Sequence, residues 1–267
     1  PFCATLSSAQ SVTLSGTGSY TGGTFSAPAG LSINSASGDI TPSTSTPGPY
    51  TVTYTILGTG GCPNVVVTTS VTITAPVSAG TLSGTQSICV GDSVTFGSSV
   101  SGGTWTSSNP AIATINASTG AIVGVSAGTA TMTYTVLGSG GCPNASDVRT
   151  MTVNSILSPV INCGTSTTSS VQFTWASVGG ATGYNLSYQI NAGAVVSVGA
   201  IGNVTSYLFS SLSPGDVVSI TLIPTGPAPS CFASSTLSCT ANNCVLPTAS
   251  ISYAGSPFCA TVSSVQS

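Results

Sequence analysis

The chain repeats itself at two different spacings, and this internal repetition limits the folds that it can adopt. Residues 1–11 (PFCATLSSAQS) recur at 257–267 (PFCATVSSVQS) with nine of eleven positions identical, at an offset of 256 residues. Inside that period, residues 51–64 (TVTYTILGTGGCPN) recur at 131–144 (TMTYTVLGSGGCPN) with eleven of fourteen positions identical, at an offset of 80. This shorter offset exceeds the roughly 20–45 residues of a solenoid coil and suits one small β-sandwich per unit. We therefore expect a series of small sandwich domains within a longer period.

Apolar residues alternate with Ser and Thr in many short runs, for example 50–56 and 129–136. Gly, Pro, Asn and Ser bound these runs, as is typical of β-strands. No segment of helical length shows a 3.6-residue period, and no run approaches the roughly 18 apolar residues of a membrane helix. The sequence therefore predicts an all-β fold of tandem immunoglobulin-like β-sandwiches in an elongated array, with no membrane-spanning segment.

Short motifs divide the array into domains of two kinds. Residues 105–110 (WTSSNP) and 124–130 (GVSAGTA) make 77–155 resemble bacterial Ig-like group 2 domains, and 1–76 is its divergent sibling. Residues 171–175 (VQFTW), 183–188 (GYNLSY) and 212–216 (LSPGD) make 156–246 resemble a fibronectin type III domain. That resemblance implies Trp175 on the second strand and Tyr184 on the third. The family's usual Tyr after the Leu-x-Pro-Gly turn is replaced by Val217 or Val218.

The ends of the chain suggest neighbouring copies of the same unit. Residues 247–267 are predicted to begin another copy of the first domain, because they contain the recurring PFCAT motif. By the same reasoning, we expect a preceding copy to supply the first strand of the domain at 1–76, as Ser250–Gly255 does for the next copy.

The chain contains nine cysteines, an odd number that the repeat explains. The first two domains each hold two at matching places, and the third holds four, which allow three pairings. Strands A and G run parallel in a fibronectin-like sandwich, which favours one long-range and one local bond there. The predicted disulfides are Cys3–Cys62, Cys89–Cys142, Cys163–Cys231 and Cys239–Cys244. Cys259 is equivalent to Cys3, so its partner is expected in the next copy. Disulfides imply an oxidising, extracytoplasmic setting.

Ionisable residues are almost absent, which excludes most kinds of chemistry. Charged residues make up 2% of the chain, with no His, Lys or Glu; they are Asp39, Asp92, Asp147, Asp216 and Arg149. General acid–base catalysis needs a tuned titratable group, and nucleic-acid or anionic-membrane binding needs clusters of Lys and Arg. Zinc sites usually need His or paired thiolates. We therefore expect no enzyme activity, no catalytic residues, no metal, no cofactor and no nucleic-acid partner.

Three single positions have both a functional and a structural interpretation. Ser93 lies in Asp-Ser-Val, which matches the three-residue O-glycosylation motif of Bacteroidetes, although so short a motif also arises by chance. Trp105 and Trp175 could stack on sugars, but both fall at core positions of the families that the domains resemble. We expect the two Trp side chains to pack in cores and Arg149 to be a solvated strand residue near Asp147.

Tandem Ig-like and fibronectin-like units, rich in cysteine and nearly free of charge, resemble the giant repetitive cell-surface adhesins of Bacteroidetes. The gliding-motility adhesins exported by the type IX secretion system are the nearest such family. The resemblance implies an extracellular repeat of an adhesin or filament shaft, which supports surface attachment or gliding. Its partners would be neighbouring repeats of the same chain, other filaments, surface polysaccharide or the substratum. Two alternatives remain open: a spacer or carbohydrate-binding array of a secreted hydrolase, and a surface-layer or sheath protein.

Overall fold

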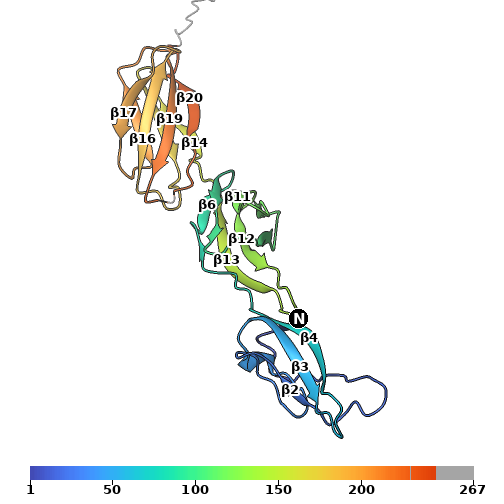
Figure 1. Ribbon diagram of the computed structural model, residues 1–267. Helices are drawn as coiled ribbons and strands as arrows, with labels where there is room; N and C mark the ends of the chain where they lie inside the picture. Colours follow the sequence, from blue (N-terminus) through green and yellow to red (C-terminus); the bar gives the residue numbers. More distant parts are fainter. Residues whose placement is uncertain (229, 245–267) are drawn as a thin grey trace, which may run out of the picture. The chain divides into compact units, whose positions relative to one another are not determined.

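The computed structural model describes residues 1–228 and 230–244 (Figure 1). These residues form β1 to β20, and their helical structure is limited to a single 3-10 turn, η1 (Pro42–Thr44). They make two compact units, of which the first contains Pro1–Leu157 and Ala228–Cys231. The second contains Ser158–Pro227 and the described residues from Phe232 onwards. No helix long and apolar enough to cross a membrane occurs in the described residues. The all-β fold class is confirmed.

The first sandwich is built around one four-stranded sheet, in the order β1-β4-β3-β2. Its strands are β1 (Phe2–Cys3), β2 (Thr24–Ser26), β3 (Gly48–Ile56) and β4 (Val65–Thr74). β3 and β4 form an antiparallel hairpin, and β1 pairs in parallel with the last residues of β4, with Cys3 opposite Thr74. The chain facing this sheet forms only isolated bridges at Ile40. Six buried residues make the core: Phe25, Leu31, Ile40, Val52, Tyr54 and Ile73.

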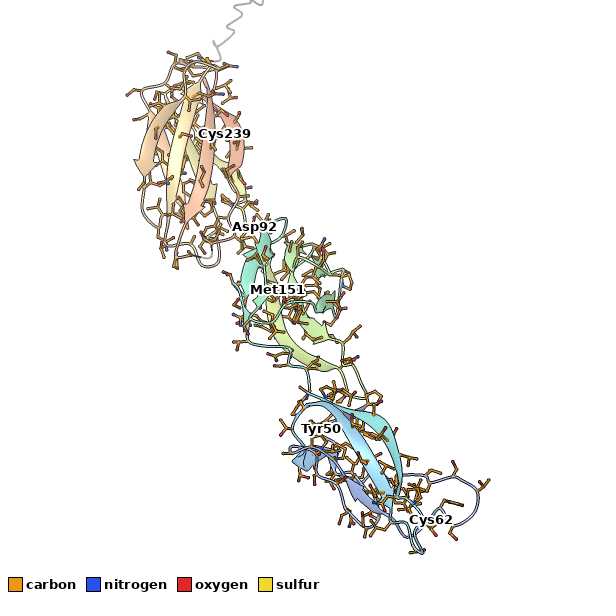
Figure 2. The ribbon with its side chains drawn as sticks, viewed as in Figure 1. Tyr50, Cys62, Asp92, Met151 and Cys239 are labelled. Carbon is orange, nitrogen blue, oxygen red and sulfur yellow. A yellow bond between two sulfur atoms is a disulfide. The ribbon has the colours of Figure 1, made fainter. Side chains whose placement is uncertain are left out.

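The second sandwich has the same main sheet and a more complete opposite layer. Its sheets have the orders β6-β13-β12-β9, β10-β11-β7 and β5-β8. The strands are β5 (Leu82–Ser83), β6 (Ser87–Cys89), β7 (Ser93–Thr95), β8 (Gly97–Ser98), β9 (Thr104–Ser107), β10 (Ala113–Ile115), β11 (Ala121–Gly124), β12 (Gly128–Val136) and β13 (Ala145–Asn154). Twelve buried residues form its core, including Met151 (Figure 2). This core therefore has twice as many buried residues as that of the first sandwich.

A tyrosine on the long hairpin fastens the Gly-Gly turn in both Ig-like sandwiches. The hydroxyl of Tyr134 accepts a hydrogen bond from the amide of Gly103 (2.8 Å) and donates one to the carbonyl of Val100 (2.8 Å). A Cβ atom on Gly103 would collide with the Tyr134 ring, so glycine is required there. The first sandwich repeats this arrangement 80 residues earlier with Tyr54, Gly23 and Tyr20. The shared brace explains why the Gly-Gly-Thr-aromatic motif occurs in both domains.

The third sandwich has the strand order of a fibronectin type III domain. One sheet is β14-β15-β18 and the other β17-β16-β19-β20. Its strands are β14 (Ile161–Ser166), β15 (Ser170–Trp175), β16 (Gly183–Ile190), β17 (Val196–Ala200), β18 (Ser206–Ser210), β19 (Val217–Thr225) and β20 (Ser235–Thr240). Trp175 ends β15 and packs edge-on against Tyr184 of β16, with ring centroids 5.7 Å apart. Trp105 and Trp175 are both 4% exposed, which confirms their expected place in the cores.

The strand ladders of the described residues stay within 1–76, 77–155 or 156–246. The expected division at residue 76 nevertheless falls inside the first compact unit, because the first two sandwiches belong to that unit together. The expected start of another copy, at 247–267, lies outside the described residues.

Candidate functional site: cross-linked junctions and an open groove

The structure contains three disulfides among its described residues, and none is a predicted pair. They are Cys3–Cys142, Cys89–Cys231 and Cys163–Cys239. The predictions Cys3–Cys62, Cys89–Cys142, Cys163–Cys231 and Cys239–Cys244 are therefore wrong. Cys62 and Cys244 are free and exposed, and Cys259 lies outside the described residues.

Sheet register explains why each Ig-like sandwich does not bond to itself. Cys3 lies opposite Thr74, the last residue of β4, whereas Cys62 lies in the turn before β4 begins. Ten residues at about 3.3 Å each place these positions about 30 Å apart, whereas a disulfide needs Cα atoms within about 7 Å. The same register separates Cys89, opposite the end of β13, from Cys142 in the turn before it. The two cysteines of each Ig-like sandwich are thus at opposite ends of one sheet.

The Cys163–Cys239 bond closes the third sandwich between its two sheets. Cys163 lies in β14 and Cys239 in β20, and these strands are edge strands of different sheets. Their Cα atoms are 5.8 Å apart. The expectation that strand A would bond to strand G is met by Cys239 rather than Cys231, because β20 begins only at Ser235. Cys231 precedes that strand, in the connection from β19.

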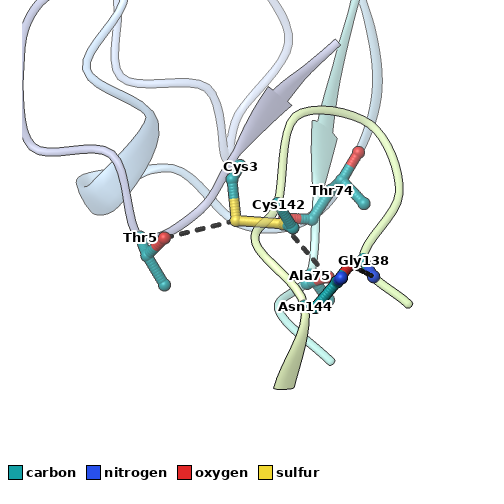
Figure 3. The surroundings of a disulfide bond; sticks show 7 residues. All are labelled: Cys3, Thr5, Thr74, Ala75, Gly138, Cys142 and Asn144. Atoms are coloured by element: carbon teal, nitrogen blue, oxygen red, sulfur yellow. Dashed lines mark hydrogen bonds between the residues drawn. A yellow bond between two sulfur atoms is a disulfide. The ribbon is translucent and has the colours of Figure 1, made fainter. Parts of the chain in front are cut away.

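Cys3–Cys142 joins the end of the first sandwich to the β12–β13 turn of the second (Figure 3). The Cα atoms of the two cysteines are 4.7 Å apart. The Sγ atom of Cys142 lies 3.4 Å from the carbonyl oxygen of Thr74 and 3.5 Å from that of Ala75, and Cys142 is only 9% exposed. A side chain at Gly140 would collide with Thr74. The turn is therefore packed against the place where β4 ends.

Cys89–Cys231 is the corresponding bond of the second sandwich. Cys89 ends β6, and Cys231 belongs to the short segment that the first compact unit includes. The amide of Leu157 donates a hydrogen bond to the carbonyl of Cys231 (2.8 Å), which adds a backbone contact near this link. Along the chain, Cys231 lies in the connection between the last two strands of the third sandwich.

The first sandwich contains the same turn as Cys142, in nearly the same conformation. The amide of Gly58 donates to Asn64 Oδ1 (3.0 Å), as the amide of Gly138 donates to Asn144 Oδ1 (3.0 Å). The paired glycines have φ values of 61° and 87° at Gly60 and Gly61, and of 58° and 85° at Gly140 and Gly141. Its surroundings differ, because a Cβ atom on Gly60 or Gly61 would meet no atom within 4 Å. Cys62 is thus presented on a preformed and uncovered turn (Figure 2).

Arg149 fastens the first strand of the second sandwich to its sheet. Its guanidinium donates to the carbonyls of Leu82 (3.3 Å) and Gly84 (2.7 and 3.2 Å). The same group lies 5.5 Å from the centre of the Phe96 ring. Leu82 is thereby held in the core at 8% exposure. The expectation of a solvated arginine near Asp147 missed this role, because the distant β5 carbonyls leave no local sequence signal.

The first sandwich has no strand equivalent to β5 among its described residues, and a groove occupies the corresponding place. The groove comprises cavities of about 330 and 230 Å³. Residues shared by both linings are Val12, Thr13, Val52 and Thr69. Thr69 is the counterpart of Arg149 at the offset of 80. The first sandwich therefore combines a smaller core with an open groove beside Thr69.

Asp216 has a structural role in the third sandwich. Asn191 Nδ2 donates to Asp216 Oδ1 (2.7 Å), and the amide of Ser213 donates to Asp216 Oδ2 (2.7 Å). These two bonds hold the pKa of Asp216 below its usual value, the Asn191 bond contributing most. They brace the Leu-x-Pro-Gly turn, where the fibronectin family usually has a tyrosine. The carboxylate thus holds the turn through one side chain, Asn191, and one backbone amide, that of Ser213.

The remaining polar candidates are dispersed. Ser93 is exposed on β7, an edge strand, and the neighbouring Asp92 accepts a hydrogen bond from the amide of Cys89 (3.3 Å). Ser93 glycosylation therefore remains a prediction at an accessible position. The described residues contain no group of three potential metal ligands.

No family model matches the chain, and no curated protein matches it. Solved structures of similar type include domains A168–A170 from titin, at 15% identity, with 80% of this chain and 82% of that chain covered and a TM-score of 0.34. The FN1–FN3 domains of chicken CNTN1 align at 13% identity, over 79% and 83% of the two chains, with a TM-score of 0.29. A two-domain fibronectin type III segment of chicken tenascin aligns at 13% identity, over 60% and 98%, with a TM-score of 0.30.

Proposed function

We propose that this chain is a structural repeat of a secreted cell-surface adhesin or filament shaft, built to resist stretching. The pattern of cross-links supports the proposal most strongly. Cys3–Cys142 and Cys89–Cys231 connect residues 139 and 142 positions apart, each linking one sandwich to a segment of the following one along the chain. A disulfide that served only the stability of one domain would lie within that domain, as Cys163–Cys239 does.

Covalent links between successive domains limit how far a pulled chain can lengthen. Tension that enters at Cys3 passes directly to Cys142, so most of the first two sandwiches is bypassed. It then reaches Cys163 after 21 residues and passes directly to Cys239. Even complete unfolding of the hydrophobic cores would leave these short covalent routes intact. Such a design suits a shaft that holds a cell to a surface.

The other properties of the chain agree with an extracellular structural role. Disulfides persist in oxidising compartments, and the residues needed for acid–base catalysis or for binding polyanions are nearly absent. The resemblance to adhesins of Bacteroidetes extends the proposal to attachment or gliding and to export by type IX secretion. Surface polysaccharide, the substratum or other filaments would be the external partners.

Neighbouring copies would complete the first sandwich. We expect the segment equivalent to Ser250–Gly255 of a preceding copy to enter the groove as the missing strand. That segment reads S-I-S-Y-A-G, and because alternate residues of a strand share a face, its Ile and Tyr would form one apolar face if it were a strand, which suits the apolar groove. The first sandwich would then have a counterpart of β5.

Electron microscopy of the oxidised parent protein tests the shaft proposal. We expect thin particles with a period on the order of 110 Å, because three sandwiches of about 35–40 Å would follow one another. Compact globular particles would refute it. A glycan array incubated with the 267-residue chain addresses the carbohydrate-binding alternative, for which we expect no specific signal.

A further inference from the structure

The disulfides follow one rule from sandwich to sandwich. In the second and third sandwiches, the cysteine between the last two strands bonds to the preceding sandwich: Cys142 to Cys3, and Cys231 to Cys89. In the first two sandwiches, the cysteine of the strand paired in parallel with the last strand bonds forward, and these are the same Cys3 and Cys89. Along the chain, each of the first two sandwiches is therefore cross-linked once to a segment of the next.

Two cysteines of the described residues do not yet fit this rule. Cys62 occupies the position between the last two strands of the first sandwich, and Cys244 follows the last strand of the third by four residues. Both are free and exposed. Cys62 thus has the position of a cysteine that bonds to the preceding sandwich. Cys244 is the remaining cysteine of the third sandwich that could bond to the following one.

We propose that Cys62 forms a disulfide with the cysteine at the position of Cys244 in the preceding copy of the 256-residue unit. This inference rests on the proposed tandem arrangement, and it adds the chemical identity of the contact between copies. With this bond, every cysteine of one period has a partner. The three kinds of junction in the period would then each carry one covalent cross-link.

The first sandwich is already shaped to make this bond. Its turn has the backbone geometry of the Cys142 turn, yet the space around Gly60 and Gly61 is empty where Gly140 and Gly141 meet the preceding sandwich. Cys142 lies against the carbonyls of Thr74 and Ala75, where the last strand of its neighbour ends. Cys244 likewise follows the end of β20, the last strand of its sandwich. If the Cys62 turn of the next copy docked at that end, as the Cys142 turn docks at the end of β4, Cys62 and Cys244 would be neighbours.

The bond forms by ordinary thiol–disulfide exchange with an oxidant of the disulfide class, such as oxidised glutathione. The thiolate of one cysteine attacks the oxidant, which gives a mixed disulfide and releases one reduced thiol. The second cysteine then displaces the other half of the oxidant as a second thiol. Two protons and two electrons pass from Cys62 and Cys244 to the oxidant, and one protein disulfide remains.

The test uses two copies in one chain, residues 1–256 followed by 1–267, with Cys259→Ser in the second copy. This chain has sixteen cysteines, and the three observed disulfides in each copy use twelve of them. After oxidation, unfolding without reductant and alkylation, we expect two thiols if the junction bond has formed and four if it has not. Mass spectrometry should find a peptide linking Cys62 to Cys244.

The same substitution placed in either copy gives a matched pair. Cys244→Ser in the first copy should abolish the linked peptide and raise the thiol number to three. Cys244→Ser in the second copy should leave the linked peptide intact and lower the thiol number to one. Four thiols, or none because each copy bonds Cys62 to its own Cys244, would overturn the inference. Neither result would contradict the shaft proposal, because that proposal is tested separately by the particle shape in electron micrographs.

Discussion

When the oxidised chain is pulled from its two ends, it should lengthen very little. The shortest covalent route from Cys3 to residue 244 crosses two disulfides, so it contains only the 21 residues from Cys142 to Cys163 and the five after Cys239. At about 3.5 Å per extended residue, this route is about 90 Å long. Full reduction restores all 241 residues, from 3 to 244, and about 840 Å.

Two variants should give intermediate lengths, because each removes one shortcut. In Cys163→Ser the route returns from Cys142 to Cys89, crosses to Cys231 and continues to residue 244, which leaves 66 residues or about 230 Å. In the double variant Cys3→Ser with Cys142→Ser, the route runs along the chain from residue 3 to Cys89, crosses to Cys231 and continues along the chain to residue 244. It does not use the Cys163–Cys239 bond, because Cys231 already lies only eight residues before Cys239. That route contains 99 residues, or about 350 Å.

Single-molecule force spectroscopy measures the differences between these lengths, with handles at the two termini and with or without reductant. The residues outside 3–244 are present in every form and add the same length to each. The order of the four lengths is the decisive result: wild type, Cys163→Ser, the double variant, and the reduced chain. An oxidised wild-type chain that extends by several hundred ångströms would refute the cross-link pattern and the reasoning on load.

Four further predictions concern individual braces. Tyr134→Phe should lower the free energy of unfolding by about 1–3 kcal/mol in urea titrations followed by Trp105 fluorescence, since two backbone groups lose their partner. Tyr54→Phe should cost less, because its bond to the Tyr20 carbonyl is 3.3 Å long. Arg149→Met should cost about 1–2 kcal/mol in the same assay through the loss of its bonds to the carbonyls of Leu82 and Gly84, and an unchanged midpoint would contradict its bracing role. For Asp216, whose folded pKa lies below the unfolded value of about 3.9, stabilisation is present above that value and is lost as pH falls through the folded pKa. The melting temperature, read from Trp175 fluorescence, should thus differ between wild type and Asp216→Asn at pH 6, with the difference shrinking below about pH 4; a constant difference would exclude this role.

Much of the fold could be predicted from the sequence because the signals are local. Alternation of apolar residues with Ser and Thr marks the strands, and the recurring Gly-Gly-Thr-aromatic motif marks one brace. Trp175 and Tyr184 meet in the third core, as the resemblance to fibronectin type III domains implied. Each of these features depends on residues within one strand or one turn.

The disulfide pairs could not be predicted in the same way. Matching positions suggested that Cys3 and Cys62 belong together, but pairing depends on which end of a sheet each residue occupies. That information lies in the parallel register of β1 against the end of β4, which no local pattern records. Arg149 was misjudged for a similar reason, since its partners are carbonyls 65 and 67 residues away.

The order of the cysteines also constrains how such a protein matures. A chain oxidised as it emerges from a membrane would join cysteines in the order of their appearance, and Cys3 would meet Cys62 first. In the folded molecule Cys3 instead bonds to Cys142, although Cys62 and Cys89 both come earlier in the chain. The sheets must therefore form while the thiols are still reduced, or an isomerase must later reshuffle the bonds. Formation of the observed pairs therefore depends on folding that stays ahead of oxidation, or on later exchange of the bonds.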